Sequence, residues 1–147
     1  MTTGTSPRRL RLTAPVPAEG EIQAAVASAL DVLLLPPAVW TSFPAGHVPL
    51  PPAYASKLAR LGLKRGIPDL LVWHAGRSYG IELKRPGARL SRTRRVRTRR
   101  GALRIVEGQA DVFPRLEAAG MQIATCDSVP AVLTALAGWG VPVRGWT

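Results

Sequence analysis

Residues 66–84 read GIPDLLVWHAGRSYGIELK, and this stretch decides the fold. Its two apolar runs, DLLVWH and YGIELK, are rich in β-branched and aromatic residues and are joined by the turn-forming residues AGRS. Two such runs with a tight connection are typical of a β-hairpin. Each run also contains one acid, Asp69 or Glu82. Because an unpaired charge in a buried strand is costly, these carboxylates need a compensating partner.

The whole chain is strongly basic. It has 20 Lys and Arg residues against nine Asp and Glu residues, which gives a formal net charge of +11. A positive field of this size attracts polyanions, nucleic acid first and an anionic membrane second. The basic residues do not follow one face of an amphipathic helix, and no run of about 18 apolar residues is present. The sequence therefore favours DNA as the partner and disfavours a membrane.

The length and composition predict one folded domain. A chain of 147 residues can hold one hydrophobic core, and apolar residues make up 46% of it, which excludes a disordered tail. Cys126 is the only cysteine, and the first 20 residues lack the apolar centre of a secretion signal. We expect a cytoplasmic protein with a basic arm, flexible or forming a short strand, at residues 1–17 and a single domain at residues 18–147.

Apolar spacing and turn residues predict the elements outside the central stretch. Apolar residues recur at three- and four-residue steps from Glu19 and predict a helix that ends before Pro36. Strands are expected at 39–43 and 121–126, and further helices at 53–62, 110–120 and 128–140. Ser128 is the expected N-cap of the last helix, and Pro114 fits its helix only in the first turn. This order predicts a small mixed α/β sheet flanked by helices.

The two acids of the central stretch form a candidate catalytic cluster with a lysine. Side chains alternate along a strand, so Glu82 and Lys84 share one face, with Leu83 buried behind them, and Asp69 can approach Glu82 from the neighbouring strand. Two carboxylates repel unless a cation, a proton or a lysine offsets the charge. Mg²⁺ prefers such oxygen ligands together with a substrate phosphate, and Lys84 could orient or deprotonate the attacking water. The alternative interpretation is a surface salt-bridge cluster on an edge strand.

The same residues resemble a known nuclease signature. Pro68 and Asp69, twelve intervening residues and then the ELK of 82–84 look like the PD-(D/E)xK motif. The surrounding segments EGEIQ, KLARLGLKRGIPDLLVW, GIELKRPGARLS and GQADVFPRLEAAGMQIATCDSV are similar to the virus-type replication-repair nuclease family, VRR-NUC, over residues 19–137. The resemblance implies a restriction-endonuclease-like fold and a Mg²⁺- or Mn²⁺-dependent endonuclease. Small members of the family are phage and bacterial proteins of DNA repair, recombination or replication that cut branched DNA, such as Holliday junctions or flaps, as homodimers.

The resemblance also implies roles for individual residues in the central stretch. Asp69 and Glu82 match the metal-binding acids, and Lys84 matches the catalytic lysine. The carbonyl of Leu83 is the expected further metal ligand.

Two further candidate catalytic residues lie on helices. The glutamate of the family's first helix matches Glu19, a catalytic and metal-binding candidate, with Glu21 as the second choice. Gln109 opens the segment that matches the family's glutamine-containing helix. Glu19 could instead be an ordinary first-turn acid that complements the helix dipole, and Gln109 an exposed polar residue at a helix start.

An arginine-rich stretch interrupts the resemblance. From Arg85 to Arg104 the chain has nine arginines and no acid, and we interpret residues 92–108 as an insertion. It could form a basic β-hairpin that turns near Arg100 and Gly101, or a mobile arm that orders on DNA. A solvated surface normally mixes both signs of charge, so phosphate contact is the favoured interpretation. The expected DNA-binding residues are Arg85, Arg89, Arg92, Arg94, Arg95, Arg97, Arg99, Arg100 and Arg104.

Other residue types add little to the functional argument. Two histidines and one cysteine are too few for a zinc site. The tryptophans are expected in the core or at an interface, and these are Trp40, Trp73, Trp139 and Trp146, the last of them a candidate contact with a second subunit. The leading hypothesis is a metal-dependent endonuclease for branched DNA. The alternatives are a non-catalytic basic DNA-binding module and a sequence-specific restriction-type endonuclease.

Overall fold

The computed structural model describes residues 15–43 and 50–146. Most of the expected basic arm at residues 1–17 therefore lies outside the described residues, and so do residues 44–49. The described helices are α1 (Glu19–Leu33), α2 (Pro52–Arg60), α3 (Gln109–Ala118) and α4 (Val129–Gly138). The described strands are β1 (Val39–Ser42), β2 (Leu70–His74), β3 (Arg77–Leu83), β4 (Arg94–Arg97), β5 (Leu103–Val106) and β6 (Gln122–Cys126). The predicted mixed α/β class is confirmed.

A four-stranded mixed sheet with the strand order β1-β2-β3-β6 forms the centre of the molecule. β2 is antiparallel to both β1 and β3, and β6 is parallel to β3. The predicted hairpin of the central stretch is confirmed, but its turn is shorter than AGRS, because His74 pairs with Arg77. The two turn residues, Ala75 and Gly76, have positive φ angles of 49° and 74°. Positive φ at both positions is what the tightest hairpin turns require.

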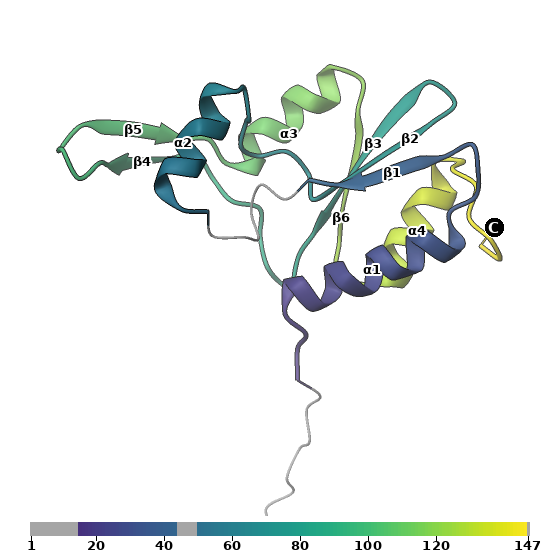
Figure 1. Cartoon of the computed structure of the whole chain (residues 1–147). Coiled ribbons are helices and arrows are strands. Elements are labelled where there is room, and N and C mark those ends of the chain that lie inside the picture. The colour runs from purple at the N-terminus through teal and green to yellow at the C-terminus, as the bar shows by residue number, and fades with distance from the viewer. Residues whose placement is uncertain (1–14, 44–49, 147) are drawn as a thin grey trace, which may run out of the picture.

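Helices cover the sheet on both sides (Figure 1). In Figure 1, α1 and α4 lie beneath the sheet and α3 lies above it. The main core lies between the sheet and the α1–α4 layer, and its central members are Ile22, Val26, Leu30, Leu70, Val72, Tyr79, Ile81, Leu83, Val132, Leu133 and Leu136. Side chains alternate along β3, so Glu82, between Ile81 and Leu83, points to the opposite face, where α3 lies.

The tryptophans occupy different environments. Trp139 stacks on the buried ring of Tyr79 with 5.1 Å between the ring centroids, and Trp40 packs against the core. Trp146 packs within its own chain, since its Nε1–H donates a hydrogen bond to Thr134 Oγ1 at 3.3 Å. Trp73 is 42% exposed, so of the two expected environments, the core or an interface, it does not occupy the core. It follows Val72 on β2 and therefore points to the less covered face of the sheet.

Pro114 lies inside α3 and not in its first turn, which corrects the prediction that this proline fits its helix only in the first turn. A proline inside a helix has no N–H to donate to the carbonyl four residues earlier. The side chain is exposed, so its ring does not displace any core residue. Ser128 is confirmed as the N-cap of α4, and its Oγ accepts a hydrogen bond from the Ala131 N–H at 3.4 Å.

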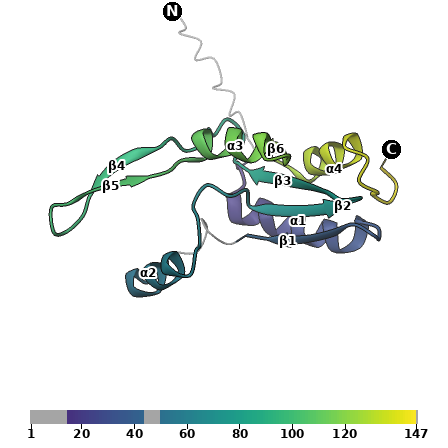
Figure 2. The ribbon, with the colours of Figure 1, turned by 90° about the horizontal axis from the view of Figure 1, so that it is seen from above.

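The arginine-rich insertion forms a second, two-stranded sheet. Of the two alternatives left open by the sequence, the structure shows the β-hairpin, in which β4 and β5 pair from Arg94 with Val106 to Arg97 with Leu103. We call residues 94–106 the basic ribbon. The ribbon and α2 both lie beyond the same end of the four-stranded sheet (Figures 1 and 2).

Within the described part of the chain, none of the helices has the length and apolar character needed to cross a bilayer.

Candidate active site

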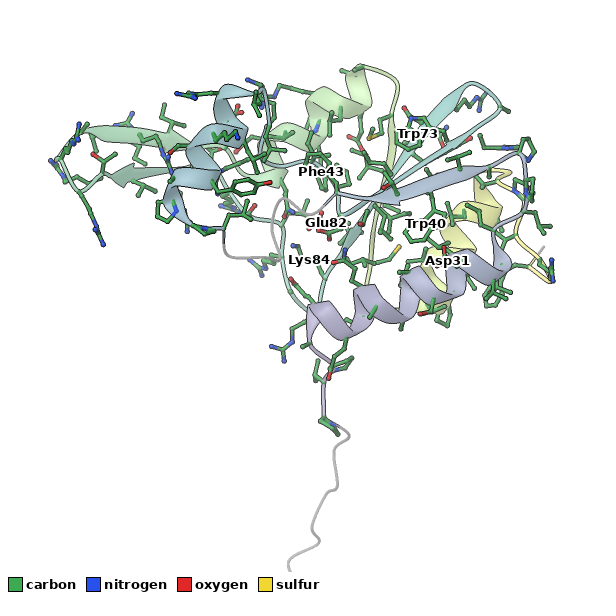
Figure 3. The ribbon with its side chains drawn as sticks, in the orientation of Figure 1. Asp31, Trp40, Phe43, Trp73, Glu82 and Lys84 are labelled. Carbon is green, nitrogen blue, oxygen red and sulfur yellow. The ribbon has the colours of Figure 1, made fainter. Side chains whose placement is uncertain are left out.

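Asp69, Glu82 and Lys84 meet at one end of the four-stranded sheet. β2 and β3 are antiparallel and Leu70 pairs with Ile81, so the residue before β2 lies beside the last residues of β3. Asp69 is buried, and its Oδ2 accepts a hydrogen bond from the Leu83 N–H at 2.8 Å. Figure 3 shows Glu82 and Lys84 close together at this end of β3. The proximity predicted from strand geometry is therefore confirmed.

Glu82 is the most deeply buried polar residue of this cluster, with 0% of its surface exposed. Its Oε1 accepts hydrogen bonds from Lys84 Nζ, at 2.6 Å, and from Gln109 Nε2. Its Oε2 is buried and has no hydrogen-bond partner among the described residues. Burial raises the pKa of Glu82 above its usual range, and the charge of Asp69 adds to this effect, against the opposing influence of Lys84 and Gln109. One carboxylate oxygen is thus buried without a hydrogen bond from the described residues, which is unfavourable for a charged group.

Lys84 follows β3 directly and shares the face of Glu82. Partial burial lowers the pKa of Lys84, but its hydrogen bond to Glu82 and the charges of Glu82, Glu19 and Asp69 outweigh that effect. The pKa of Lys84 therefore lies above its ordinary value, and the side chain is an ammonium ion at neutral pH. An ammonium in this position can donate hydrogen bonds and stabilise negative charge.

Gln109 is the first residue of α3, and it joins Glu82 to the segment that leads into the ribbon. Its Oε1 accepts hydrogen bonds from the Ser91 N–H at 3.3 Å and from the Ser91 hydroxyl at 3.4 Å. In return, the Gln109 N–H donates to Ser91 Oγ at 3.1 Å. The sequence identified Gln109 but missed Ser91. The two residues lie 18 positions apart, so no local pattern could have predicted this contact.

The two acids at the start of α1 have different surroundings. Glu21 Oε2 accepts a hydrogen bond from the Ala18 N–H at 2.8 Å, which closes the first turn of the helix. Glu19 is near enough to Lys84 for its charge to raise the pKa of the lysine. The geometry therefore favours Glu19 over Glu21 as the first-helix candidate. In residues 15–43 and 50–146, no three His, Cys, Asp or Glu side chains form a group that could hold a metal ion, so Glu19 is not gathered with Asp69 and Glu82.

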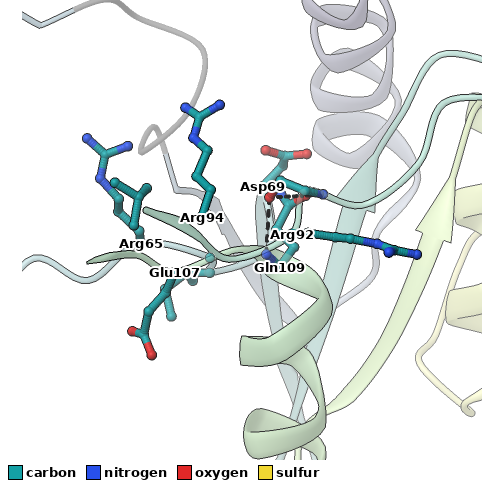
Figure 4. A pocket seen from close by; sticks show the side chains of 10 residues that line it. Arg65, Asp69, Arg92, Arg94, Glu107 and Gln109 are labelled. Atoms are coloured by element: carbon teal, nitrogen blue, oxygen red, sulfur yellow. Dashed lines mark hydrogen bonds between the residues drawn. The ribbon is translucent and has the colours of Figure 1, made fainter. Parts of the chain in front are cut away.

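A cavity of about 340 Å³ adjoins the cluster (Figure 4). Asp69 and Gln109 line it, and so do Arg65, Arg92 and Arg94. In Figure 4 the Arg92 side chain extends in a different direction from those of Arg65 and Arg94. In Figure 4 the carboxylate of Glu107, which also lines the cavity, points away from Asp69, and Arg115 Nη2 pairs with that carboxylate at 2.6 Å. The lining is therefore suited to an anion of phosphate size beside the acids. Arg65 was not among the predicted DNA contacts.

The predicted arginines are spread over several surfaces. Arg85 lies with Lys84 in a smaller cavity of about 200 Å³, and Arg89 is exposed. Arg104 lines a groove of about 510 Å³ between the ribbon and α2, together with Lys64 and Arg65. The remaining four are exposed on the ribbon, and these are Arg95, Arg97, Arg99 and Arg100. Arg92 and Arg94 alone among the nine border the active-site cavity.

Comparison of the chain with protein-family models, with curated proteins and with solved structures found no match. The function is therefore argued from the site itself.

Proposed function

We propose that this protein is a metal-dependent endonuclease of the restriction-endonuclease-like fold, related to the VRR-NUC nucleases, that hydrolyses phosphodiester bonds in branched DNA. One observation carries the proposal. Glu82 is buried, its Oε1 pairs with Lys84, and its Oε2 has no hydrogen-bond partner among the described residues, while Asp69 and Gln109 beside it line a cavity that three arginines also line. The mixed sheet and four helices are compatible with the fold that the resemblance implies.

The donor set of the cluster fits a hard divalent cation. Mg²⁺ and Mn²⁺ prefer carboxylate oxygens, and a cation would offset the repulsion by which Asp69 raises the pKa of Glu82. Asp69 and Glu82 would hold the ion, and the Leu83 carbonyl and Glu19 remain candidates for further ligands. When bound, the ion would polarise the scissile phosphate and stabilise the charge that develops on it.

The chain's own residues would position the reactants. Water attacks phosphorus while the bond from phosphorus to one sugar oxygen breaks, which leaves a phosphomonoester and a free hydroxyl. Lys84 Nζ is held by Glu82 at 2.6 Å and, as an ammonium, can orient the water and stabilise phosphate charge. Gln109 fixes the Glu82 carboxylate, and Arg65 and Arg94, which line the neighbouring cavity, would hold a phosphate beside Asp69. Alignment of the reactants in this way supplies much of the rate enhancement that an enzyme gives to such a displacement.

The deciding experiment combines substrate choice with ion dependence. Labelled four-way junctions, flaps, splayed arms and linear duplexes are incubated with Mg²⁺, Mn²⁺ or EDTA. We expect cutting of the branched substrates with either ion and none with EDTA. Asp69→Asn and Lys84→Met should cut at least about 100-fold more slowly while they still bind DNA. Asp31→Asn is the matched control, because Asp31 is exposed on α1 and lies well away from Glu82 and Lys84 in Figure 3.

Each other outcome selects a different function. Cutting by both variants at the parent rate would contradict the assignment of the active site. Binding of DNA without cutting under any ion would identify a basic binding module. Cutting of linear duplexes at a short sequence, whatever the branch structure, would identify a restriction-type enzyme. The resemblance also proposes a homodimer, which sedimentation of the free protein would test.

A further inference from the structure

The basic ribbon has two faces of different character. Residues directly opposite each other in an antiparallel pair share a face, and successive residues alternate. On the inner face, Arg94 and Val106 line the active-site cavity, and Arg104 lines the groove beside α2. The outer face consists of the cross-strand pairs Arg95 with Ile105 and Arg97 with Leu103.

The outer face exposes two large apolar side chains. Leu103 is 64% exposed and Ile105 is 66% exposed, which leaves most of each side chain in water. Exposed apolar groups in a cluster commonly mark a binding surface. Here each apolar residue lies directly across the ribbon from an arginine, so the surface offers apolar contact and positive charge in alternation.

Charge identifies the partner of this face. Residues 85–106 contain nine arginines and no acid, so a second copy of this chain would set like charge against like charge. A polyanion is the complementary partner. The major groove of duplex DNA is about 12 Å wide and admits a two-stranded β-ribbon.

Hydrogen bonds hold the ribbon at both ends. At the tip, the Thr98 N–H donates to the Ala102 carbonyl at 2.8 Å, and the Ala102 N–H donates to Thr98 Oγ1 at 3.2 Å. At the base, the Thr93 N–H donates to Asp111 Oδ2 at 3.2 Å, and the Gly108 N–H donates to Thr93 Oγ1 at 3.1 Å. A ribbon fixed in this way loses little conformational entropy on binding.

We propose that the basic ribbon enters the major groove of a duplex arm of the substrate, where Leu103 and Ile105 contact base edges and Arg95 and Arg97 contact the flanking phosphates. Apolar side chains in this groove contact the C5-methyl group of thymine, so the ribbon adds a preference among bases to its grip on phosphate. The inference takes DNA as the partner from the proposed function but does not depend on cleavage.

Salt dependence separates the two kinds of contact. Each phosphate contact contributes about −0.9 to the slope of log K against log salt, whereas an apolar contact contributes nothing to it. Arg95→Gln with Arg97→Gln should therefore flatten the slope by about 2. Leu103→Ser with Ile105→Ser should weaken binding about tenfold at every salt concentration and leave the slope unchanged. Val32→Ser is the matched control, because Val32 on α1 is also 64% exposed.

The measurement is fluorescence anisotropy of a labelled duplex in EDTA, with the fold of each variant checked by circular dichroism. Deoxyuridine in place of thymidine should weaken binding by the parent but not by the Leu103→Ser, Ile105→Ser variant. Methyl green, which occupies the major groove, should displace the parent, and netropsin, which occupies the minor groove, should not. Equal affinity of the parent for both duplexes, displacement by netropsin, or unchanged binding by the double serine variant would overturn the proposal. Since EDTA prevents metal-dependent cutting, each of these results is independent of whether the protein is a nuclease.

Discussion

Replacement of Gly108 by alanine should disturb the active site from outside it. Gly108 precedes α3, at the point where the segment that leads into the ribbon passes the start of the helix. A Cβ atom at this position would lie 2.2 Å from the carbonyl carbon of Arg92 and 2.5 Å from the carbonyl oxygen of Ser91. The φ of Gly108 is −103°, which any residue adopts, so the effect of alanine is steric and not conformational.

The size of the effect follows from these contacts. Both atoms belong to the backbone, so no side-chain rotation can relieve the overlap. An ordinary contact begins near 3.4 Å, and the Arg92 backbone must therefore retreat by about 1.2 Å. Overpacking of this kind costs about 1–3 kcal/mol of folding free energy. The displaced segment includes Ser91, which holds Gln109 against Glu82, and a misplacement of about 1 Å can slow a reaction by about 100-fold.

The assay combines urea denaturation with single-turnover cutting of the preferred DNA. Gly108→Ala should lose about 1–3 kcal/mol of stability and cut about 10- to 100-fold more slowly. Gly138→Ala is the matched control, because a Cβ at Gly138 meets nothing within 4 Å, and it should be as stable as the parent or up to about 1 kcal/mol more stable. Parent-like stability of Gly108→Ala would refute the packing argument. If Gly108→Ala loses stability but cuts at the parent rate, the argument that Ser91 positions Gln109 and Glu82 for cutting would be refuted.

Three further predictions concern the fold and the acid cluster. Pro114→Ala restores an N–H inside α3 and should raise the free energy of unfolding by about 1–2 kcal/mol in urea denaturation, and a lower stability would contradict this. Burial raises the pKa of Glu82, so the folded protein binds that proton more tightly than the unfolded chain does, and the contribution of Glu82 to stability falls as pH rises from the ordinary glutamate pKa through the folded one. Thermal melts in EDTA should show this fall in stability with rising pH, and the fall should be smaller in Glu82→Gln. At neutral pH, Mn²⁺ should stabilise the parent but not Glu82→Gln. Burial raises the pKa of the Cys126 thiol to about 11, so its alkylation at pH 8 should be slow and follow unfolding, whereas rapid labelling of the native protein would contradict its burial.

The sequence predicted the central hairpin because its information is local. Alternating side chains and a short connection fix which residues of β2 and β3 face each other, and this places Asp69 beside Glu82. The turn was predicted too long because Ala75 has a positive φ, which a non-glycine residue seldom adopts. The sequence left Trp73 as either a core or an interface residue, because an apolar run does not reveal that only one face of its strand is well covered.

The rest of the site depends on contacts that no local pattern contains. Ser91 reaches Gln109 only because the chain returns along the ribbon, and Arg65 reaches the cavity from the segment before β2. The place of Pro114 within α3 also depends on a contact between segments far apart in the sequence. α3 begins just after Gly108, which packs against the backbone of Arg92, and the preference of proline for the first turn of a helix contains no information about that contact.

The partners of the acids explain why carboxylates persist in so basic a chain. Glu21 accepts from the Ala18 N–H, Asp111 accepts from the Thr93 N–H, and Glu107 pairs with Arg115. Each of these acids is exposed, and each has a structural role that its protein partner satisfies. Glu82 differs, because it is fully buried and one of its oxygens has no partner in the described part of the chain. Burial of a carboxylate in this state is unfavourable, so a ligand with positive charge would stabilise Glu82 more than it would any of the exposed acids with protein partners.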